Sequence, residues 1–447
     1  MSFTTDKQTL DDLNIFGKRG NDSIYTIFNH TCTSGGAEVL EQMFRYPLAE
    51  VETINERSGI IQYFESIGGV FPFQSALFDS AEQYLSNTDN RSRLMQEQNT
   101  LGRKFNNIIG SDTEYQLIYK GVTSIREIFH NLNEFIVGIK DSSSQTPYST
   151  DVDEMSKIIS DPELEILLQG KRSGKLSFNE VAEYDKVFRY NARDKIKKLL
   201  YFIYNLDVYI SVAGVAKKRN FIFPKALDKD NGCVTLEGVY HPQVPGAVPN
   251  TMYITPESNI IFLTGANMAG KSTFMKTLGI AMFLAHMGFP VPAQRMEFSV
   301  RDGIYTTINL PDNLSMGYSH FYVEVVRVKK MAELVSKSKN LFIIFDELFR
   351  GTNVKDAYEA TIAITGAFAQ KPNCMFVVST HIIEAGDVLK AQHDNINFIY
   401  LPTLMKGNNP VYPYKLESGI TADRHGMIII NNEGIIDIIK SRKKQIS

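Results

Sequence analysis

The chain has 447 residues, enough for roughly two to four domains that could each bury a hydrophobic core. Its formal net charge of -3 excludes a strongly basic protein, so any contact with nucleic acid must come from local clusters. Three widely spaced cysteines without C-x-x-C spacing indicate a reducing compartment and argue against zinc. The N-terminus lacks a signal-peptide pattern and the longest apolar run is too short to span a bilayer. We therefore expect a cytoplasmic protein without membrane contact.

Residues 1–230 contain few β-rich runs and many segments with helical spacing of apolar residues. One helix is predicted at Ala37–Phe44 and is ended by Pro47, and a long amphipathic helix is predicted at Leu117–Val137. The polar stretch Asp141–Asp151 predicts a surface loop. The first half of the chain is therefore expected to be an all-α domain.

A further long helix is predicted to begin at a capping box, Ser177 followed three residues later by Glu180. Four basic residues recur along this helix at spacings of three and four, which predicts that they share one face: Lys186, Arg189, Arg193 and Lys197. A solvated face is the ordinary interpretation of such a stripe. A face that contacts phosphates is the alternative.

Residues 231–447 change to short β-rich runs and carry a phosphate-loop pattern. Ile260–Thr264 predicts a buried strand, a G-x-x-x-x-G-K-S sequence follows it, and a helical pattern comes directly after. A chance loop between strand and helix is the alternative, but strand, loop and helix occur together. The predicted nucleotide-binding residues are Gly265, Ala266, Asn267, Met268, Ala269, Gly270, Lys271 and Ser272.

This loop has the chemistry that a nucleoside triphosphate requires. Backbone N–H groups and a helix N-terminus meet multiply charged phosphates with fixed dipoles. Gly265 and Gly270 allow the close approach or unusual φ that a Cβ would prevent. Lys271 would reach the β- and γ-phosphates, and the hydroxyl of Ser272 would coordinate Mg²⁺.

Two more apolar strands are predicted to deliver polar side chains to the same sheet edge. The apolar run Leu341–Phe345 is followed directly by Asp346 and Glu347. We expect Asp346 to hold Mg²⁺ through its water shell and Glu347 to orient and polarise the attacking water. Met375–Ser379 leads to His381, for which we expect a role at the γ-phosphate. A structural histidine is the alternative.

Ser319 precedes a helical pattern and is expected to be its N-cap. The same geometry allows a sharper role, because a helix N-terminus with a free hydroxyl can bind an anion. If two chains face each other, Ser319 of one could complete the γ-phosphate pocket of the other. Nucleotide binding and dimer closure would then be one event.

Five ordered segments together resemble the MutS family of DNA mismatch-repair ATPases: TGANMAGKSTFMK, GFPVPA, GYSHFYVEV, FDELFRGTN and STHIIE. The resemblance covers roughly residues 10–440. It implies an α/β P-loop ATPase domain of the ABC type at residues 231–447, preceded by an all-α core or lever domain at residues 1–230. It also implies a homodimer formed through the ATPase domains, with ATP and Mg²⁺ bound.

The resemblance implies site roles that agree with those argued from the residues themselves. Lys271 and the backbone as far as Thr273 would bind phosphates, Ser272 and Asp346 would serve Mg²⁺, and Glu347 would activate water. Ser319 would act across the dimer, and His381 would lie near the γ-phosphate.

The chain also departs from the family pattern. The mismatch-reading and connector domains are not evident, the region near residues 135–180 is too short for a full DNA clamp, and a C-terminal dimerisation extension is not evident. In the site, Ala266 and Ala269 replace the usual Pro and Gly, and Phe349 replaces a Gly after the carboxylates. Ala247 stands where family members often stack an aromatic ring on adenine.

Two functions remain open at the level of sequence. The first is a MutS-like DNA-binding ATPase that couples ATP hydrolysis to dimer closure and to engagement of DNA or a repair partner, without mismatch specificity of its own. The second is a nucleotide-gated scaffold that binds a protein partner without gripping DNA. A transporter ATPase is disfavoured because an L-S-G-G-Q-like signature is lacking.

Overall fold

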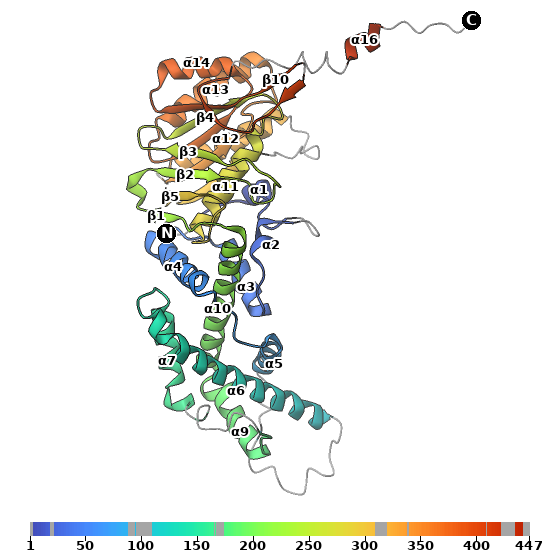
Figure 1. Cartoon of the computed structure of the whole chain (residues 1–447), viewed down its shortest axis with the longest axis vertical. Coiled ribbons are helices and arrows are strands. Elements are labelled where there is room, and N and C mark those ends of the chain that lie inside the picture. Colours follow the sequence, from blue (N-terminus) through green and yellow to red (C-terminus); the bar gives the residue numbers. More distant parts are fainter. Residues whose placement is uncertain are drawn as a thin grey trace, which may run out of the picture. The chain divides into compact units, whose positions relative to one another are not determined.

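The computed structural model describes residues 3–17, 22–87, 94, 110–164, 166, 174–308, 320–337, 339–407, 409–421 and 434–440 (Figure 1). The chain forms two compact units. The sheet unit contains residues 1–27, 46–58 and 218–447, and the helical unit contains residues 28–45 and 59–217. Two N-terminal segments therefore pack with the sheet unit, although the sequence-based division placed them in the helical domain.

The helical unit is built from amphipathic helices that bury their apolar faces together. Helices α2 (Ile24–Phe28) and α4 (Val51–Ile67) cross between this unit and the sheet unit along the chain. The other elements are α3 (Ser34–Arg45), α5 (Ser75–Ser86), α6 (Gly110–Ser143), α7 (Ser149–Ile159), η4 (Pro162–Leu164), α9 (Phe178–Lys186), η5 (Val187–Asn191) and α10 (Arg193–Arg219), which ends in the sheet unit.

The sequence pattern located α3, α6 and the start of α9. The predicted helix at Leu117–Val137 lies within α6, and α3 ends at Arg45 before Pro47. The capping box at the start of α9 is present: Glu180 N donates to Ser177 Oγ at 3.4 Å, and Ser177 N donates to Glu180 Oε2 at 2.7 Å. The predicted loop at Asp141–Asp151 is shorter than expected, because α6 runs to Ser143 and α7 starts at Ser149.

The prediction that four basic residues share one helical face was wrong. Arg189 is only 5% exposed and forms a buried ion pair with Asp185, with Nε and Oδ1 2.6 Å apart. The helix changes to a π-turn over η5, which shifts the register of the residues that follow. Arg193 donates to the carbonyl oxygen of Leu85 at 2.9 Å. These contacts leave no continuous basic stripe.

Helix α10 is apolar because it crosses the core of the helical unit. Among the described residues it is the one helix long and apolar enough to cross a membrane by composition, but 72% of its apolar window is buried inside the protein. Burial in the core of the helical unit therefore accounts for the apolar composition of α10.

The sheet unit is organised around a six-stranded sheet of order β12-β9-β4-β8-β7-β6, parallel except for the β12–β9 pair. Its strands are β4 (Ile260–Gly265), β6 (Gly303–Thr307), β7 (Leu341–Phe345), β8 (Met375–Ser379), β9 (Ile396–Leu401) and β12 (Glu417–Ser418). Strands β4, β7 and β8 are buried along their whole length, as expected of a parallel sheet covered on both faces.

Helices and a second sheet complete this unit. The helices are α1 (Lys7–Asp12), α11 (Lys271–His286), α12 (His320–Val335), α13 (Val354–Ala369), α14 (Ile383–Gln392) and α16 (Ile435–Lys440), with the short η6 (Lys229–Asn231). The strands of the second sheet are, in spatial order, β1 (Lys225–Leu227), β5 (Arg295–Ser299), β2 (Val234–Val239) and β3 (Asn250–Ile254). Two further strands, β10 (Leu404–Lys406) and β11 (Asn409–Val411), pair with each other.

Helix α11 explains how the two sheets are joined. It is apolar on nearly all sides, and it contacts β4 and β6 of the first sheet and β2 of the second. Because β4 leads directly into this helix, the loop between them is fixed at the carboxyl edge of the parallel sheet. Ligands of α/β proteins bind at this edge.

Candidate nucleotide-binding site

The loop between β4 and α11 has the backbone conformation that its glycines predict. Gly265 and Gly270 have φ values of +147° and +100°. A Cβ on Gly265 would lie 2.9 Å from the carbonyl oxygen of Leu401, and one on Gly270 would lie 3.1 Å from the ring of Tyr414. Gly270 is the N-cap of α11 and provides no side-chain cap. The N–H groups of the first turn are thus not occupied by a capping side chain and can meet an anion.

The side chain of Lys271 lies back across this loop. Its Nζ donates to the carbonyl oxygens of Gly265 at 2.8 Å and Ala266 at 3.2 Å. Burial lowers the pKa of Lys271, while the carboxylates of Asp346 and Glu347 act in the opposite direction. The loop lysine and both predicted carboxylates therefore interact electrostatically at one edge of the sheet.

The carboxylate of Asp346, directly after β7, is incompletely satisfied. Its Oδ1 and the Oγ of Ser379 are buried, and neither has a hydrogen-bond partner within the described part of the chain. Burial is the largest influence on the pKa of Asp346 and raises it; the hydroxyl of Ser272 lowers the pKa and the charge of Glu347 raises it. A buried carboxylate beside hydroxyl oxygens is the donor set that Mg²⁺ prefers, so these residues fit that ion.

Glu347 is held by two cationic or polar neighbours. Its Oε1 lies 2.6 Å from His381 Nε2, and its Oε2 accepts from Arg350 Nη1 at 2.6 Å. Burial is the largest influence on the pKa of Glu347 and raises it, but the contacts with His381 and Arg350 together hold the pKa below its ordinary value. The backbone at Glu347 and Phe349 has φ values of +50° and +63°, which side chains rarely adopt.

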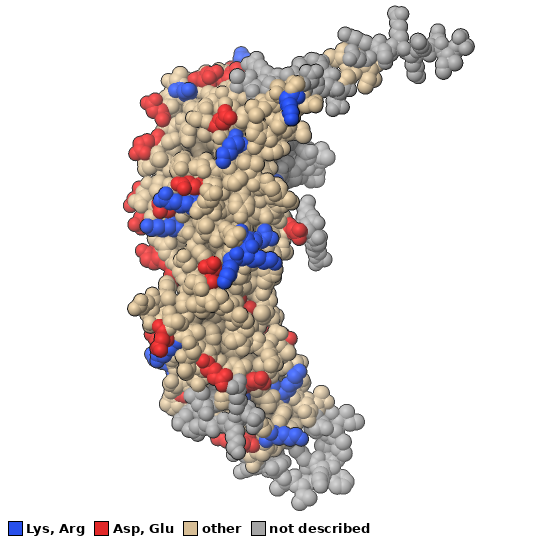
Figure 2. Space-filling model, in the orientation of Figure 1, with Lys and Arg blue, Asp and Glu red and all other residues tan. Residues whose placement is uncertain are grey.

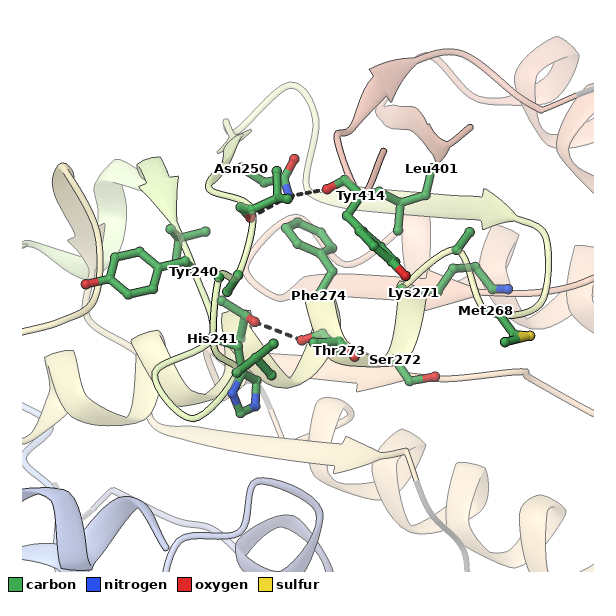
Figure 3. Close-up of a pocket in the computed structure, with 18 of the residues that line it drawn as sticks. Tyr240, His241, Asn250, Met268, Lys271, Ser272, Thr273, Phe274, Leu401 and Tyr414 are labelled. Atoms are coloured by element: carbon green, nitrogen blue, oxygen red, sulfur yellow. Dashed lines mark hydrogen bonds between the residues drawn. The ribbon is translucent and has the colours of Figure 1, made fainter. Parts of the chain in front are cut away.

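The loop forms one wall of a cavity of about 500 Å³. The segment 239–250, the start of α11, Leu401 and Tyr414 form the other walls. Asn250 holds Tyr414 in place, because its Nδ2 donates to Tyr414 O at 2.9 Å and its Oδ1 accepts from Leu416 N at 2.8 Å. In Figure 3, Tyr414 lies beside the loop and His241 lies at the opposite side of the cavity.

Tyr414 was missed by the sequence reasoning, which looked for an aromatic ring at residue 247. Ala247 does line the cavity, but its aromatic lining comes from Tyr240, His241, Tyr414 and Phe274 of α11. Tyr414 lies more than a hundred residues beyond the loop, and its backbone has a φ of +56°. The sequence around it offers an aromatic pair, Tyr412 and Tyr414, as a local signal.

The predicted residues are distributed as follows. The structure brings Gly265, Lys271, Ser272, Asp346, Glu347 and His381 to one edge of the sheet, with Ala266, Asn267, Met268, Ala269, Gly270 and Thr273 lining the cavity beside them. Ser319 lies outside the described residues, and α12 begins at the next position, His320. Within the described residues no group of three or more His, Cys, Asp or Glu is placed to hold a metal ion.

Two family models match the chain, MutS domain III at residues 8–213 and MutS domain V at residues 261–447. The DNA mismatch repair protein MutS of Petrotoga mobilis is 30% identical over 271 residues, which cover 59% of this chain and 33% of that protein. The proteins of the same name from Fusobacterium nucleatum and Clostridioides difficile are 29% and 32% identical over 57% and 44% of this chain. The matches cover 28% and 21% of the length of those two proteins. The chain therefore spans about a third or less of the curated relatives that it matches.

Proposed function

Because this chain belongs to the MutS family, we propose that it is a MutS-like ATPase in which hydrolysis of ATP is coupled to closure of a dimer and to engagement of DNA. The observation that carries the proposal is the meeting of Lys271, Asp346 and Glu347 around a glycine-bounded loop that leads into a helix. A sheet edge with this set of groups suits a nucleoside triphosphate and its metal.

In this proposal the phosphates lie against the N–H groups of the loop and the first turn of α11. To bind ATP, Lys271 must give up its hydrogen bonds to the carbonyl oxygens of Gly265 and Ala266 and donate to phosphate oxygens instead. The pKa of Lys271 is lowered because burial leaves its ammonium group poorly solvated. Ser272 and Asp346 would hold Mg²⁺, which when bound neutralises charge that develops on the phosphate oxygens. Tyr414 and Phe274 would form the apolar wall for the base.

Glu347 is the proposed base that orients and polarises water. A base must carry a negative charge at neutral pH, and the lowered pKa of Glu347 meets that requirement. His381 contacts Oε1 of the carboxylate and Arg350 donates to Oε2, so the two side chains together fix the orientation of Glu347. We therefore assign His381 to positioning of Glu347 as well as to the γ-phosphate role suggested by the sequence.

Exposed apolar side chains in the phosphate loop and on helices α12 and α13 support closure against a second copy. Met268 in the loop is 75% exposed, and Val354 at the start of α13 is 77% exposed. Tyr322, Val325 and Val326 are also exposed on α12. A second ATPase unit with the same patch would bury these side chains, as an isologous dimer does. Ser319, one residue before α12, would then reach the partner's γ-phosphate.

The experiment is to compare nucleotide binding and steady-state ATP hydrolysis in two variants and two controls. Lys271→Ala should abolish ATP binding, while Glu347→Ala should bind ATP and lose turnover by about a hundredfold or more. Lys355→Ala and Glu359→Ala, on the exposed side of α13, are matched charge controls that should behave as the unmodified chain. Full binding and turnover in both site variants would refute the assignment.

The alternative is a nucleotide-gated scaffold that binds a protein partner without gripping DNA. On the face shown in Figure 2, basic and acidic side chains are interspersed, and no single extended basic surface stands out. A salt series with duplex, mismatched and branched DNA separates the two functions, because each true phosphate contact contributes a log-log slope of about -0.9. Steep salt dependence with ATP present favours the DNA-binding ATPase, and a flat response or no binding favours the scaffold.

The cytoplasmic location predicted from the sequence belongs to the same proposal. Specific recognition of mismatches by this chain alone is not part of it.

A further inference from the structure

Two buried oxygen atoms at the carboxyl edge of the six-stranded sheet have no hydrogen-bond partner among the residues that the structure describes. One is Oδ1 of Asp346, directly after β7, and the other is Oγ of Ser379, the last residue of β8. The side chain of Ser379 is completely buried. Buried polar groups without a partner are destabilising and therefore rare, so this pair of atoms requires an explanation.

The strand register places these two side chains next to each other. Strands β7 and β8 are parallel and Phe345 is paired with Val378, so Asp346 and Ser379 occupy the next positions along the two strands. Asp346 continues the sheet, because its N donates to Thr307 O at 2.9 Å. Since side chains alternate between the two faces along each strand, residues at paired positions lie on the same face.

The electrostatic environment of Asp346 agrees with this placement. Burial is the largest influence on the pKa of Asp346 and raises it, and the hydroxyl of Ser379 is among the groups that lower the pKa. The hydroxyl therefore lies close enough to the carboxylate to favour its charged form.

The backbone of Ser379 is occupied by the sheet, but its hydroxyl is not. Strand β8 lies between β4, which leads into the phosphate loop, and β7. Ser379 is paired with Leu263 of β4, and its carbonyl oxygen accepts from Leu348 N at 3.1 Å. These contacts would be kept by any residue other than proline. Within the described part of the chain, they give no structural reason for a hydroxyl at this position.

The two groups are chemically complementary. A serine hydroxyl has one O–H donor that can rotate, and an ionised carboxylate is only an acceptor. Carboxylates that hold a metal ion are themselves commonly held by a hydrogen bond, and loss of that partner weakens metal binding. Hydrogen bonds of this kind often tighten only when the substrate binds.

We propose that Ser379 is a positioning residue for Asp346: when ATP and Mg²⁺ bind, its hydroxyl donates to Oδ1 of Asp346 and so turns Oδ2 toward the ion and its water shell. This inference rests on the proposed ATPase function. It assigns the metal site a second hydroxyl, which acts through the carboxylate, whereas the hydroxyl of Ser272 would act on the ion itself.

The test measures how much Mg²⁺ the full chain needs to bind a non-hydrolysable ATP analogue. In Ser379→Ala, the Mg²⁺ concentration that gives half-maximal binding should rise about tenfold, the effect expected when a metal-binding carboxylate loses its partner. Binding of the analogue without Mg²⁺ should be unchanged, because the phosphate loop is intact. Ser379→Cys keeps the size of the side chain but supplies only a weak donor, so its Mg²⁺ requirement should also rise. An unchanged requirement in both variants would overturn the proposal.

Thr365→Val is the matched control. Thr365 is also completely buried, and its Oγ1 has no partner among the described residues. It lies near the end of α13, where the chain returns to the start of β8 at the opposite edge of the sheet. Each replacement removes a buried unpartnered hydroxyl, so neither should lower the midpoint of urea unfolding without Mg²⁺.

The stability that Mg²⁺ and the analogue add together should distinguish the two positions. This added stability should be smaller in Ser379→Ala than in the unmodified chain, and it should be unchanged in Thr365→Val. A midpoint that Ser379→Ala lowers equally with and without the two ligands would show a purely structural hydroxyl and contradict the inference.

The double variant with Asp346→Asn shows whether Ser379 acts through that carboxylate. If it does, Ser379→Ala should add little to the raised Mg²⁺ requirement of Asp346→Asn, whereas independent effects would multiply. Multiplied effects would therefore refute the assignment. An unmodified chain that binds no analogue at any Mg²⁺ concentration is a different result, and contradicts the proposed ATPase function itself.

Discussion

Phe349 offers a sharp test of the backbone geometry beside Glu347. It is a bulky residue at a φ of +63°, where L side chains are disfavoured, and its buried ring lies 6.1 Å from the ring of Phe321 in the first turn of α12. The MutS resemblance places a glycine at this position. We therefore compare two replacements that both remove the ring, Phe349→Ala and Phe349→Gly.

The magnitude follows from separating the ring from the backbone. Loss of a buried phenylalanine ring costs about 3–5 kcal/mol in either variant, so it cancels in the comparison. The remaining difference is the cost of a Cβ at positive φ, about 1–2 kcal/mol, which only glycine avoids. Glycine loses part of this advantage, roughly 0.5–1 kcal/mol, through the greater freedom of the unfolded chain. Phe349→Gly should thus be more stable than Phe349→Ala by up to about 1.5 kcal/mol.

The assay is urea unfolding of the two variants, followed by circular dichroism and compared through midpoints at equal slope. The control is the same pair of replacements at Phe321, where the backbone is helical and alanine should be the more stable by up to about 1 kcal/mol. Opposite orders at the two positions are expected. An alanine variant that is clearly more stable than the glycine variant at residue 349 would refute the reasoning.

Three further predictions come from the same contacts. Gly303→Ala should destabilise the sheet unit by about 1–3 kcal/mol, measured by urea unfolding, because its Cβ would collide with Thr4 O; an unaffected midpoint would contradict this. Burial lowers the pKa of His286 to about 4, so the unfolded chain binds more protons between pH 6.5 and 4, and stability is lost as the pH falls through that window. From pH 7 to 5 the loss from this group should be about 2 kcal/mol in wild type and absent in His286→Gln, and equal losses would contradict the assignment. His381→Ala should raise the pKa of Glu347 and move the acid limb of the kcat/KM profile to higher pH, whereas an unmoved limb would argue against the Glu347–His381 contact.

The parts of the site that lie next to strands could be predicted from the sequence. Ile260–Thr264, Leu341–Phe345 and Met375–Ser379 are continuous apolar runs, and each lies in a strand of one parallel sheet. Because parallel strands end at one edge, Lys271 and the residues after β7 and β8 had to come together there. Local patterns were sufficient for this much of the geometry.

The parts that depend on burial or on distant contacts could not be predicted in this way. Arg189 looked like a solvated residue because its spacing was helical, but the nearby Asp185 is buried and pairs with it. Tyr414 lines the cavity only because Asn250 binds the backbone around it. Asp6 has no local signal for its contact with Arg327, which is 321 positions away. For Tyr414 and Asp6 the partner is set by packing, and for Arg189, whose partner lies four positions earlier, packing decides that the pair is buried.

The most direct test of the central claim is ATP hydrolysis by the purified chain as Mg²⁺ is titrated, with Glu347→Gln and Asp346→Asn beside it. The account predicts turnover that requires Mg²⁺ in wild type, ATP binding without turnover in Glu347→Gln, and a much higher Mg²⁺ requirement in Asp346→Asn. A chain that does not respond to ATP at any Mg²⁺ concentration, or that hydrolyses it equally well without either carboxylate, would contradict the claim that these groups hold one triphosphate and its metal.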